Sequence, residues 1–158
     1  MTDIAVDQPI PDFEAPTASG ETWQLSAQRG QWVVLYFFPK ANTPGCTVES
    51  EAFRDLDPRF SELGAQVVGI SRDGAKTLAN FGAKHGFGFT LLSDRDEAVC
   101  ERFGVMRDKK MFGKPVRGIE RSTFLIDPDG VLRREWRKVK VEGHAETVLE
   151  ALTELAAR

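Results

Sequence analysis

An unbroken apolar segment, Trp32–Phe38, constrains the fold more than any other part of this chain. It is rich in β-branched and aromatic residues and has no charged or amide side chain on either face. A strand that is apolar on both sides has to be covered on both sides, as in the middle of a sheet between two layers. The segment is also far too short to span a membrane. It therefore predicts a central, fully buried strand.

The rest of the chain alternates between strand-like and helix-like segments. Further strands are expected at residues 66–71, 89–93, 122–126 and 131–139, and helices from 44 and over 76–85, 94–103 and 143–157. Such alternation is typical of a parallel sheet covered by helices, and the turn Asp127–Gly130 adds an antiparallel hairpin. We expect an α/β fold, a three-layer α/β/α sandwich with a mixed central sheet, formed by residues 1–158 as a single domain.

Some details of this expectation concern individual residues. Pro58 is expected to end the first helix, because a proline inside a helix costs about 3 kcal/mol. Thr43 is a candidate N-cap for that helix, with Pro44 at the first helical position, and Asp94 for the third helix. Residues 105–120, rich in glycine and lysine, are expected to form a long loop.

Composition narrows the classes of function. The net charge is −3, so the basic surplus expected of a nucleic-acid or anionic-membrane partner is missing. The first residues show no basic segment followed by an apolar one, as a signal peptide would. Two cysteines are too few for a disulfide scaffold, and we expect reduced thiols in a cytoplasmic protein.

Cys46 is the strongest candidate for chemistry. It falls in the first turn of a helix that follows the central strand, where backbone N–H groups and the positive end of the helix dipole favour a thiolate, the nucleophilic form of cysteine. The alternative is a buried structural cysteine. The flanking Thr43-Pro-Gly and the position at the strand end favour the nucleophile.

Other cysteine chemistries do not fit the spacing. Glu49 stands three residues after Cys46 and Thr43 three before it, so the dithiol motif C-x-x-C is absent. Structural zinc sites usually need closely spaced cysteines or histidines, whereas His85 and His144 are far apart and are expected at the surface. The spacing therefore does not predict a structural zinc site.

The segment Pro39-Lys-Ala-Asn-Thr43-Pro-Gly-Cys46 fits P-x-x-x-T-x-x-C, the active-site signature of the peroxiredoxins. The chain resembles their bacterioferritin-comigratory, or PrxQ-like, branch in particular. The other matching segments are Gly69-Ile-Ser71, Leu92-Ser-Asp94, Arg121-Ser-Thr-Phe-Leu-Ile-Asp127 and Trp136–His144. The resemblance runs from about Phe13 to the C-terminus.

The resemblance implies a thioredoxin-like fold and a thiol-dependent peroxidase that reduces hydrogen peroxide and organic hydroperoxides. It also implies that no metal and no organic cofactor is required. Cys46 would be the peroxidatic residue, and Thr43 would hydrogen-bond the peroxide or the thiolate. Pro39 would shield the pocket from water, and Arg121 would stabilise the thiolate. Arg117 competes for that role, and only the Arg-Ser-Thr-Phe context selects Arg121. Glu49 either satisfies the helix dipole or orients Arg121.

The second cysteine departs from the pattern. Many PrxQ-like proteins carry a resolving cysteine five residues after the peroxidatic one, where this chain has Glu51, and residues 76–85 offer none either. Cys100 would need its α-carbon within about 7 Å of that of Cys46, or local unfolding. We expect it to be a packed core residue and the protein to be a one-Cys enzyme. Its reductant would be glutathione or another small thiol, glutaredoxin or thioredoxin, and it would be a monomer or weak dimer.

Two other functions remain open from the sequence. A thiol–disulfide exchange protein could use the same fold, although the missing C-x-x-C argues against it. A binding or holdase-like module with an inert Cys46 would belong to a different class altogether.

Overall fold

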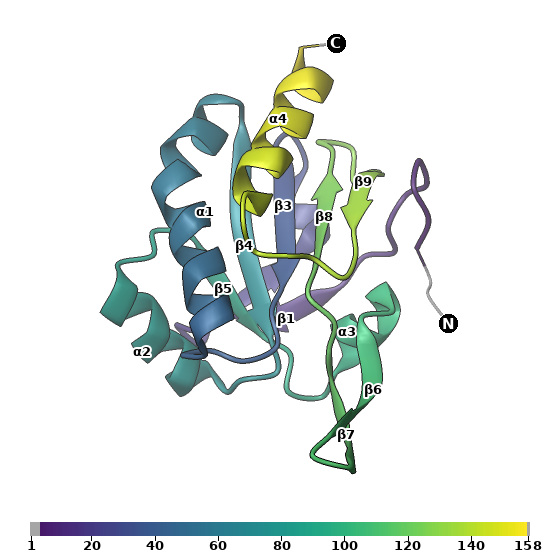
Figure 1. Cartoon of the computed structure of the whole chain (residues 1–158). Helices are drawn as coiled ribbons and strands as arrows, with labels where there is room; N and C mark the ends of the chain where they lie inside the picture. The colour runs from purple at the N-terminus through teal and green to yellow at the C-terminus, as the bar shows by residue number, and fades with distance from the viewer. Residues whose placement is uncertain (1–3, 158) are drawn as a thin grey trace.

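The central sheet has five strands in the order β5-β4-β3-β8-β9 in a computed structural model that describes residues 4–157 (Figure 1). β3 (Trp32–Phe37) lies in the middle, parallel to β4 and antiparallel to β8. The other strands are β4 Ala65–Ser71, β5 Thr90–Ser93, β8 Ser122–Ile126 and β9 Leu132–Trp136. The predicted mixed sheet and its central strand are confirmed.

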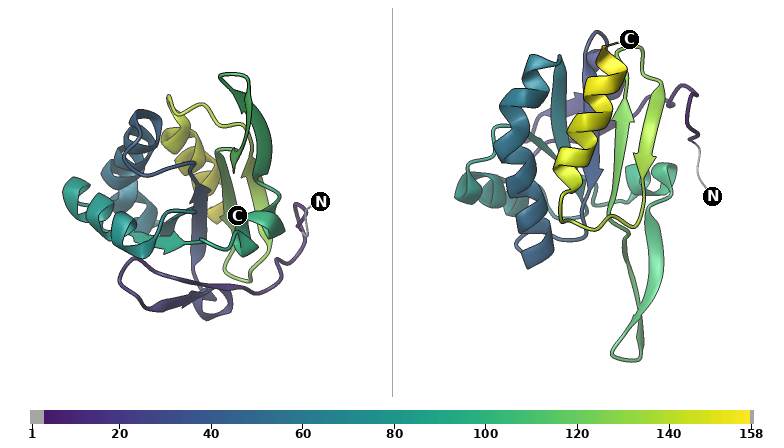
Figure 2. Two further views of the ribbon diagram at one scale, coloured as in Figure 1. Left: turned by 90° about the horizontal axis from the view of Figure 1, so that it is seen from below. Right: turned by 45° about the horizontal axis from the view of Figure 1, so that its top comes forward.

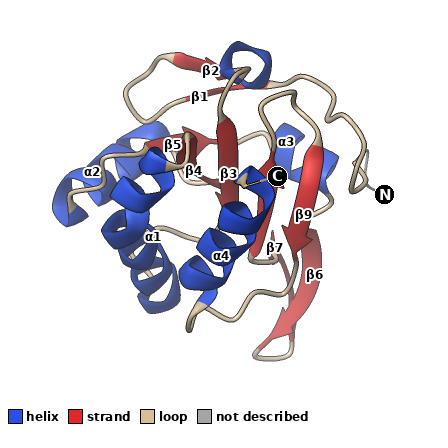
Figure 3. Cartoon of the chain, turned by 90° about the horizontal axis from the view of Figure 1, so that it is seen from above, coloured by secondary structure: helices blue, strands red, loops and turns tan. Residues whose placement is uncertain are grey.

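Side chains of the central strand and of the residue after it alternate between two hydrophobic layers. Those facing one layer are Val33, Leu35 and Phe37, and those facing the other are Val34, Tyr36 and Phe38. Three helices cover the second face: α1 (Pro44–Glu62), α2 (Ala75–His85) and α4 (His144–Ala156). The short α3 (Ala98–Phe103) and the N-terminal segment cover the first face (Figure 3). The three-layer arrangement is as predicted.

The N-terminal segment contains elements that the sequence pattern does not reveal. β1 (Glu14–Pro16) pairs antiparallel with β2 (Thr22–Gln24), and a 3₁₀ turn, Leu25–Gln28, follows. Each strand buries only its middle residue, Ala15 or Trp23. Three residues are too few for an alternating pattern to stand out, so this small sheet was not predicted.

Helix α1 continues through Pro58, so the prediction that it ends there was wrong. Proline removes one helical hydrogen bond and crowds the preceding turn. On either side of it, however, Phe53 and Phe60 are completely buried and their rings contact each other. Packing of this apolar face outweighs the local penalty.

The expected loop at 105–120 is a β-hairpin instead. β6 (Met106–Met111) pairs antiparallel with β7 (Lys114–Ile119), and the two-residue turn Phe112-Gly113 has positive φ at both positions. That conformation matches the twist of a hairpin. The hairpin projects from the body of the protein, so its strands need no apolar alternation (Figure 2). Its second strand leads directly to Arg121.

Candidate active site

Sheet pairing brings Cys46 and Arg121 together. Cys46 follows β3 through a short loop, and Arg121 immediately precedes β8. Because Phe37 pairs with Ser122 in antiparallel register, the end of β3 and the start of β8 lie at the same edge. There the Arg121 Nη2 donates to the Cys46 Sγ at 3.5 Å, across 75 positions of sequence.

Arg121 is held from two sides. Its Nη1 donates to the Glu49 Oε1 at 2.7 Å, and its backbone carbonyl accepts from the N–H of Val139 at 3.0 Å. Burial lowers the pKa of the guanidinium, but the adjacent Glu49 and Cys46 more than offset this and raise it. Of the two roles considered for Glu49, this contact matches the one in which the carboxylate orients Arg121, and it holds a cation beside the thiol.

Glu49 is an unusual ion-pair partner because it is almost fully buried, with 1% of its surface exposed. Burial raises its pKa from 4.5 to about 7, although the Arg121 guanidinium acts in the opposite direction. Within the described residues, its Oε2 has no hydrogen-bond partner. Burial therefore weakens the tendency of Glu49 to ionise, and with it the neutralisation of the Arg121 guanidinium.

The first turn of α1 leaves backbone donors near the thiol. Thr43 occupies the N-cap position as predicted, but its hydroxyl donates to the carbonyl of Lys40 at 2.7 Å instead of capping the helix. The first helical bond runs from the N–H of Thr47 to the carbonyl of Thr43. Helix geometry therefore leaves the N–H groups of Gly45 and Cys46 without helical acceptors. Such donors are suited to an anion.

Gly45 is a site residue that sequence reasoning missed. A β-carbon at this position would lie 3.1 Å from the Arg121 Nη2, so the absence of a side chain lets the guanidinium approach the first turn of α1. In the sequence, only the position of Gly45 next to Cys46 pointed to a role. That Arg121, so distant in sequence, approaches it closely could not be predicted from this position.

The two remaining candidates, Pro39 and Arg117, lie in different parts of the molecule. Pro39 is half-buried in the loop between β3 and α1, at the same end of the sheet as Cys46. Arg117 lies in β7, where it pairs with Glu97 and Glu101. Of the two arginines that compete for the thiol, only Arg121 contacts it in the described part of the chain.

A layer of buried aromatic residues lies beneath α1, the helix that carries Cys46. Tyr36 in β3 is fully buried, stacks on Phe53 of α1, and its hydroxyl lies 2.8 Å from the Ser50 Oγ. A β-carbon at Gly69 would come within 2.8 Å of the tyrosine ring, so this glycine makes room for it. Burial raises the pKa of Tyr36 well above its usual value. The tyrosine thus remains a neutral support for α1.

His144 is buried, so its predicted surface position was wrong. Its Nε2 lies 2.7 Å from the Thr123 Oγ1, and its ring contacts Phe53 and Trp136. Burial lowers its pKa to about 4, with a smaller contribution from the charge on Arg121. It joins α4 to β8 as a neutral residue. Among residues 4–157, no group of three side chains that could hold a metal ion is found, at His144 or elsewhere.

The two cysteines lie in different layers. Cys46 belongs to the hydrophobic cluster under α1, α2 and α4, and Cys100 to the cluster on the opposite face of the sheet. Asp94 accepts from the N–H groups of Val99 and Cys100 at 3.1 and 2.7 Å. Helix α3 begins at Ala98 with Glu97 at the N-cap position, so the prediction that Asp94 is the N-cap residue was wrong. The carboxylate of Asp94 nevertheless caps the free N–H groups of the first turn from outside the helix. Burial and then Asp94 raise the pKa of Cys100 well above the usual value.

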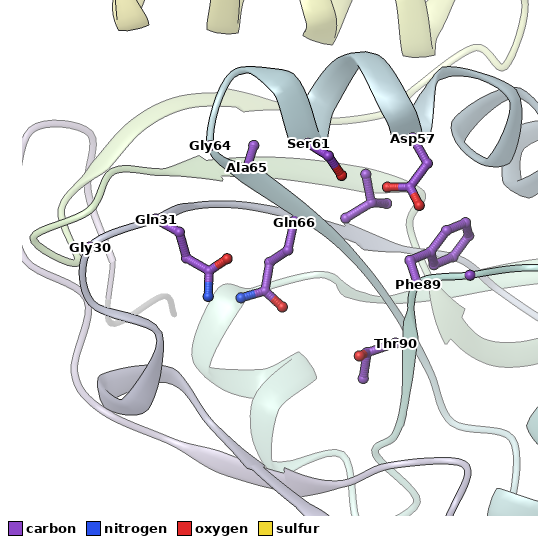
Figure 4. A pocket seen from close by; sticks show the side chains of 11 residues that line it. Gly30, Gln31, Asp57, Ser61, Gly64, Ala65, Gln66, Phe89 and Thr90 are labelled. Atoms are coloured by element: carbon purple, nitrogen blue, oxygen red, sulfur yellow. The ribbon is translucent and has the colours of Figure 1, made fainter.

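One surface pocket lies far from this site (Figure 4). It is formed where β4 and β5 begin and α1 ends, whereas Cys46 follows the far end of β3. Its labelled lining residues are Gly30, Gln31, Asp57, Ser61, Gly64, Ala65, Gln66, Phe89 and Thr90. It contains no cysteine and none of the predicted site residues.

No helix in the described part of the chain is long and apolar enough to cross a membrane.

A family model and individual relatives of this chain indicate the same protein family. Residues 6–135 match the AhpC/TSA family. Peroxiredoxin Bcp of Xanthomonas campestris is 50% identical over 154 residues, which cover 96% of each chain. Peroxiredoxin Bcp of Escherichia coli is 43% identical and covers 99% of this chain and 100% of its own.

Solved structures agree with this. A cysteine-to-serine variant of Xylella fastidiosa PrxQ superposes with a TM-score of 0.93 at 41% identity, covering 99% of both chains. The bacterioferritin comigratory protein of Xanthomonas campestris superposes with a TM-score of 0.87 at 49% identity, covering 91% of this chain and 92% of its own.

The chain therefore belongs to the AhpC/TSA family and is a thiol-dependent peroxidase with a thioredoxin-like fold. Within that family, its relatives place it in the Bcp, or PrxQ, branch of the peroxiredoxins.

Proposed function

We propose that Cys46 is the peroxidatic residue of a one-Cys enzyme that reduces hydrogen peroxide and organic hydroperoxides with an external thiol. The observation that carries this proposal is the Arg121 guanidinium 3.5 Å from the Cys46 Sγ, beside the uncapped first turn of α1. One related structure, the Xanthomonas campestris protein, is described for its alkyl peroxide reduction activity. Alkyl hydroperoxides are therefore the organic substrates to test first.

In the first step the Cys46 thiolate attacks the terminal oxygen of the hydroperoxide. A sulfur–oxygen bond forms, the O–O bond breaks, and the leaving oxygen takes a proton to give water or an alcohol. Arg121 and the N–H groups of Gly45 and Cys46 stabilise the charge that moves across the O–O bond. The Thr43 hydroxyl, which donates its proton to the Lys40 carbonyl, accepts a hydrogen bond from the peroxide, and Pro39 keeps water from the thiolate.

In the second step two equivalents of an external thiol reduce the sulfenic acid. The first forms a mixed disulfide and releases water, and the second releases Cys46 as a thiol and leaves as the disulfide. The position of Cys100 on the other face of the sheet supports an external reductant, because a Cys46–Cys100 bond would have to form across a buried layer of strands. Glutathione or another small thiol, glutaredoxin and thioredoxin are the candidates.

The remaining proposals concern the whole molecule. Residues 1–158 form one domain, as the extent of the family match and of the relatives supports. The two free buried cysteines suit a cytoplasmic enzyme. In solution the protein is a monomer or weak dimer, which sedimentation velocity tests directly.

The test of the mechanism compares Cys46→Ser with Cys100→Ser. The first should abolish peroxide reduction, while the second should retain most turnover with a small thiol. One equivalent of peroxide should give Cys46 sulfenic acid that dimedone traps, and excess peroxide should give sulfinic and sulfonic acids. A Cys46–Cys100 disulfide in the wild type, with activity lost in Cys100→Ser, would contradict the one-Cys mechanism.

A further inference from the structure

The loop between β3 and α1 carries Pro39 and Thr43 and sets how both are placed around Cys46. Hydrogen bonding between β3 and β4 continues just past β3, where the N–H of Phe38 donates to the carbonyl of Ile70 at 3.0 Å. Beyond that point the loop turns away, and Asn42 adopts a left-handed conformation with φ of 67°. The loop therefore needs another attachment to the sheet.

Asp73, three residues after that carbonyl, supplies the attachment. Its Oδ2 accepts from the N–H of Ala41 at 2.8 Å, across 32 positions of sequence. Ala41 is buried, with 4% of its surface exposed, so its N–H has little access to water. The side chain of Asp73 thus accepts a backbone N–H of the loop just beyond the point where the regular ladder between β3 and β4 stops.

The carboxylate is itself held in place. Its Oδ2 also accepts from the Ser71 Oγ at 2.7 Å, while the backbone N–H of Asp73 donates to the same hydroxyl oxygen at 3.2 Å. The carbonyl of Asp73 accepts from the Ser93 Oγ at 2.7 Å. Ser71 and Ser93 are buried at the ends of β4 and β5. Asp73 is therefore fixed by two neighbouring strands, and its bond to Ala41 holds the loop in place relative to them.

We infer that Asp73 is a positioning residue for peroxide reduction, acting through the N–H of Ala41 on the loop that carries Pro39 and Thr43. This inference rests on the proposed role of Cys46. A shift of about 1 Å in groups that contact a substrate can lower a rate on the order of a hundredfold. Reaction with peroxide requires Pro39 and Thr43 to be correctly placed, whereas alkylation of the thiol does not. Loss of the attachment should therefore slow the reaction with peroxide more than it slows alkylation.

The test measures two rates at Cys46: sulfenic acid formation with hydrogen peroxide, and alkylation by iodoacetamide followed by mass spectrometry of the Cys46 peptide. Asp73→Ala should lower the ratio of the peroxide rate to the alkylation rate by about tenfold or more. Asp73→Asn keeps an oxygen that can accept from Ala41, so it should restore most of the ratio. Ser71→Ala, which removes the group that orients the carboxylate, should give an intermediate value.

Asp127→Ala is the matched control. The Oδ1 of Asp127 also accepts two backbone N–H groups, those of Asp129 and Val131, but at the opposite end of β8 from Arg121. It should leave the ratio unchanged. An unchanged ratio in Asp73→Ala, or a ratio in Asp73→Asn as low as in Asp73→Ala, would overturn the inference. If Asp73→Ala does not fold, an unchanged ratio in Ser71→Ala overturns it. Failure of wild-type Cys46 to react with peroxide would instead reject the proposed role of Cys46.

Discussion

Cys46 and Cys100 occupy the same place in their helices, yet their surroundings are opposite. Each is the third residue of its helix, α1 or α3, and each is completely buried. At α3 the N-terminal N–H groups are taken up by the carboxylate of Asp94, which also places a negative charge beside the thiol. At α1 the hydroxyl of Thr43 turns away from the helix, and the Arg121 guanidinium lies against the sulfur.

The comparison shows that two cysteines at the same position of a helix can have opposite electrostatic surroundings. The donors of the first turn favour a thiolate only while no other anion occupies them. A neighbouring carboxylate favours the neutral thiol, and a neighbouring guanidinium favours the thiolate. Helix position and burial are equal at the two cysteines, so the capping group and the nearest charge distinguish them.

The largest expected effect is on Arg121. Arg121→Ala should slow sulfenic acid formation by about 10²–10³-fold, because one charge-stabilising donor is lost from a buried site. Arg121→Lys should recover only part of the rate, since lysine lacks the planar fork that reaches both Cys46 and Glu49. Stopped-flow measurement with peroxide gives these rates. The matched control is Arg117→Ala, and an equal loss there would contradict the assignment.

Glu49 should make stability depend on pH. Its pKa is about 7 in the folded protein, above the ordinary 4.5, so the folded state binds the proton more tightly. The resulting stabilisation is complete below about pH 4.5 and is lost as the pH rises through 7, a change of roughly 3 kcal/mol. Urea unfolding across this range should show wild type losing stability relative to Glu49→Gln. Parallel pH profiles for the two proteins would refute the expectation.

Removing the cap of α3 should make Cys100 more like Cys46. Asp94→Ala frees the N–H groups of Val99 and Cys100 and removes the adjacent negative charge, so the pKa of Cys100 should fall. Loss of the cap should lower the free energy of unfolding by about 1–2 kcal/mol. Denaturation and mass spectrometry of alkylated Cys100 measure both effects. Asp96→Ala, which removes an exposed bond to Ala98, should change each less.

The smallest effect expected is at Gly45. Gly45→Ala places a β-carbon 3.1 Å from the Arg121 Nη2, which has to shift by a few tenths of an ångström. The peroxide rate should fall on the order of tenfold, with stability kept or raised by up to about 1 kcal/mol through better helix propensity. Gly82→Ala is the control, because its β-carbon would make only ordinary contact with Leu91. Equal rates in the two variants would show that Gly45 does not set the position of Arg121.

Much of the fold could be predicted where the pattern is long or repeated. Trp32–Phe38 gave the central strand because both faces are apolar, and the spacing of leucines and valines gave α4. Prediction failed where packing overrides a local preference, as at Pro58, and where an element is short or projects from the body, as in β1, β2 and the β6–β7 hairpin.

For the site, the sequence by itself determined a cysteine in the first turn of a helix after a buried strand, within a peroxiredoxin signature. These features depend on neighbours in the chain. Only the tertiary structure decided that Arg121 meets Cys46, that Glu49 is buried, that Asp73 attaches the preceding loop, and that Cys100 lies across the sheet. Strand order and register determine those contacts, and they are set by the summed packing of many residues, which no local motif contains.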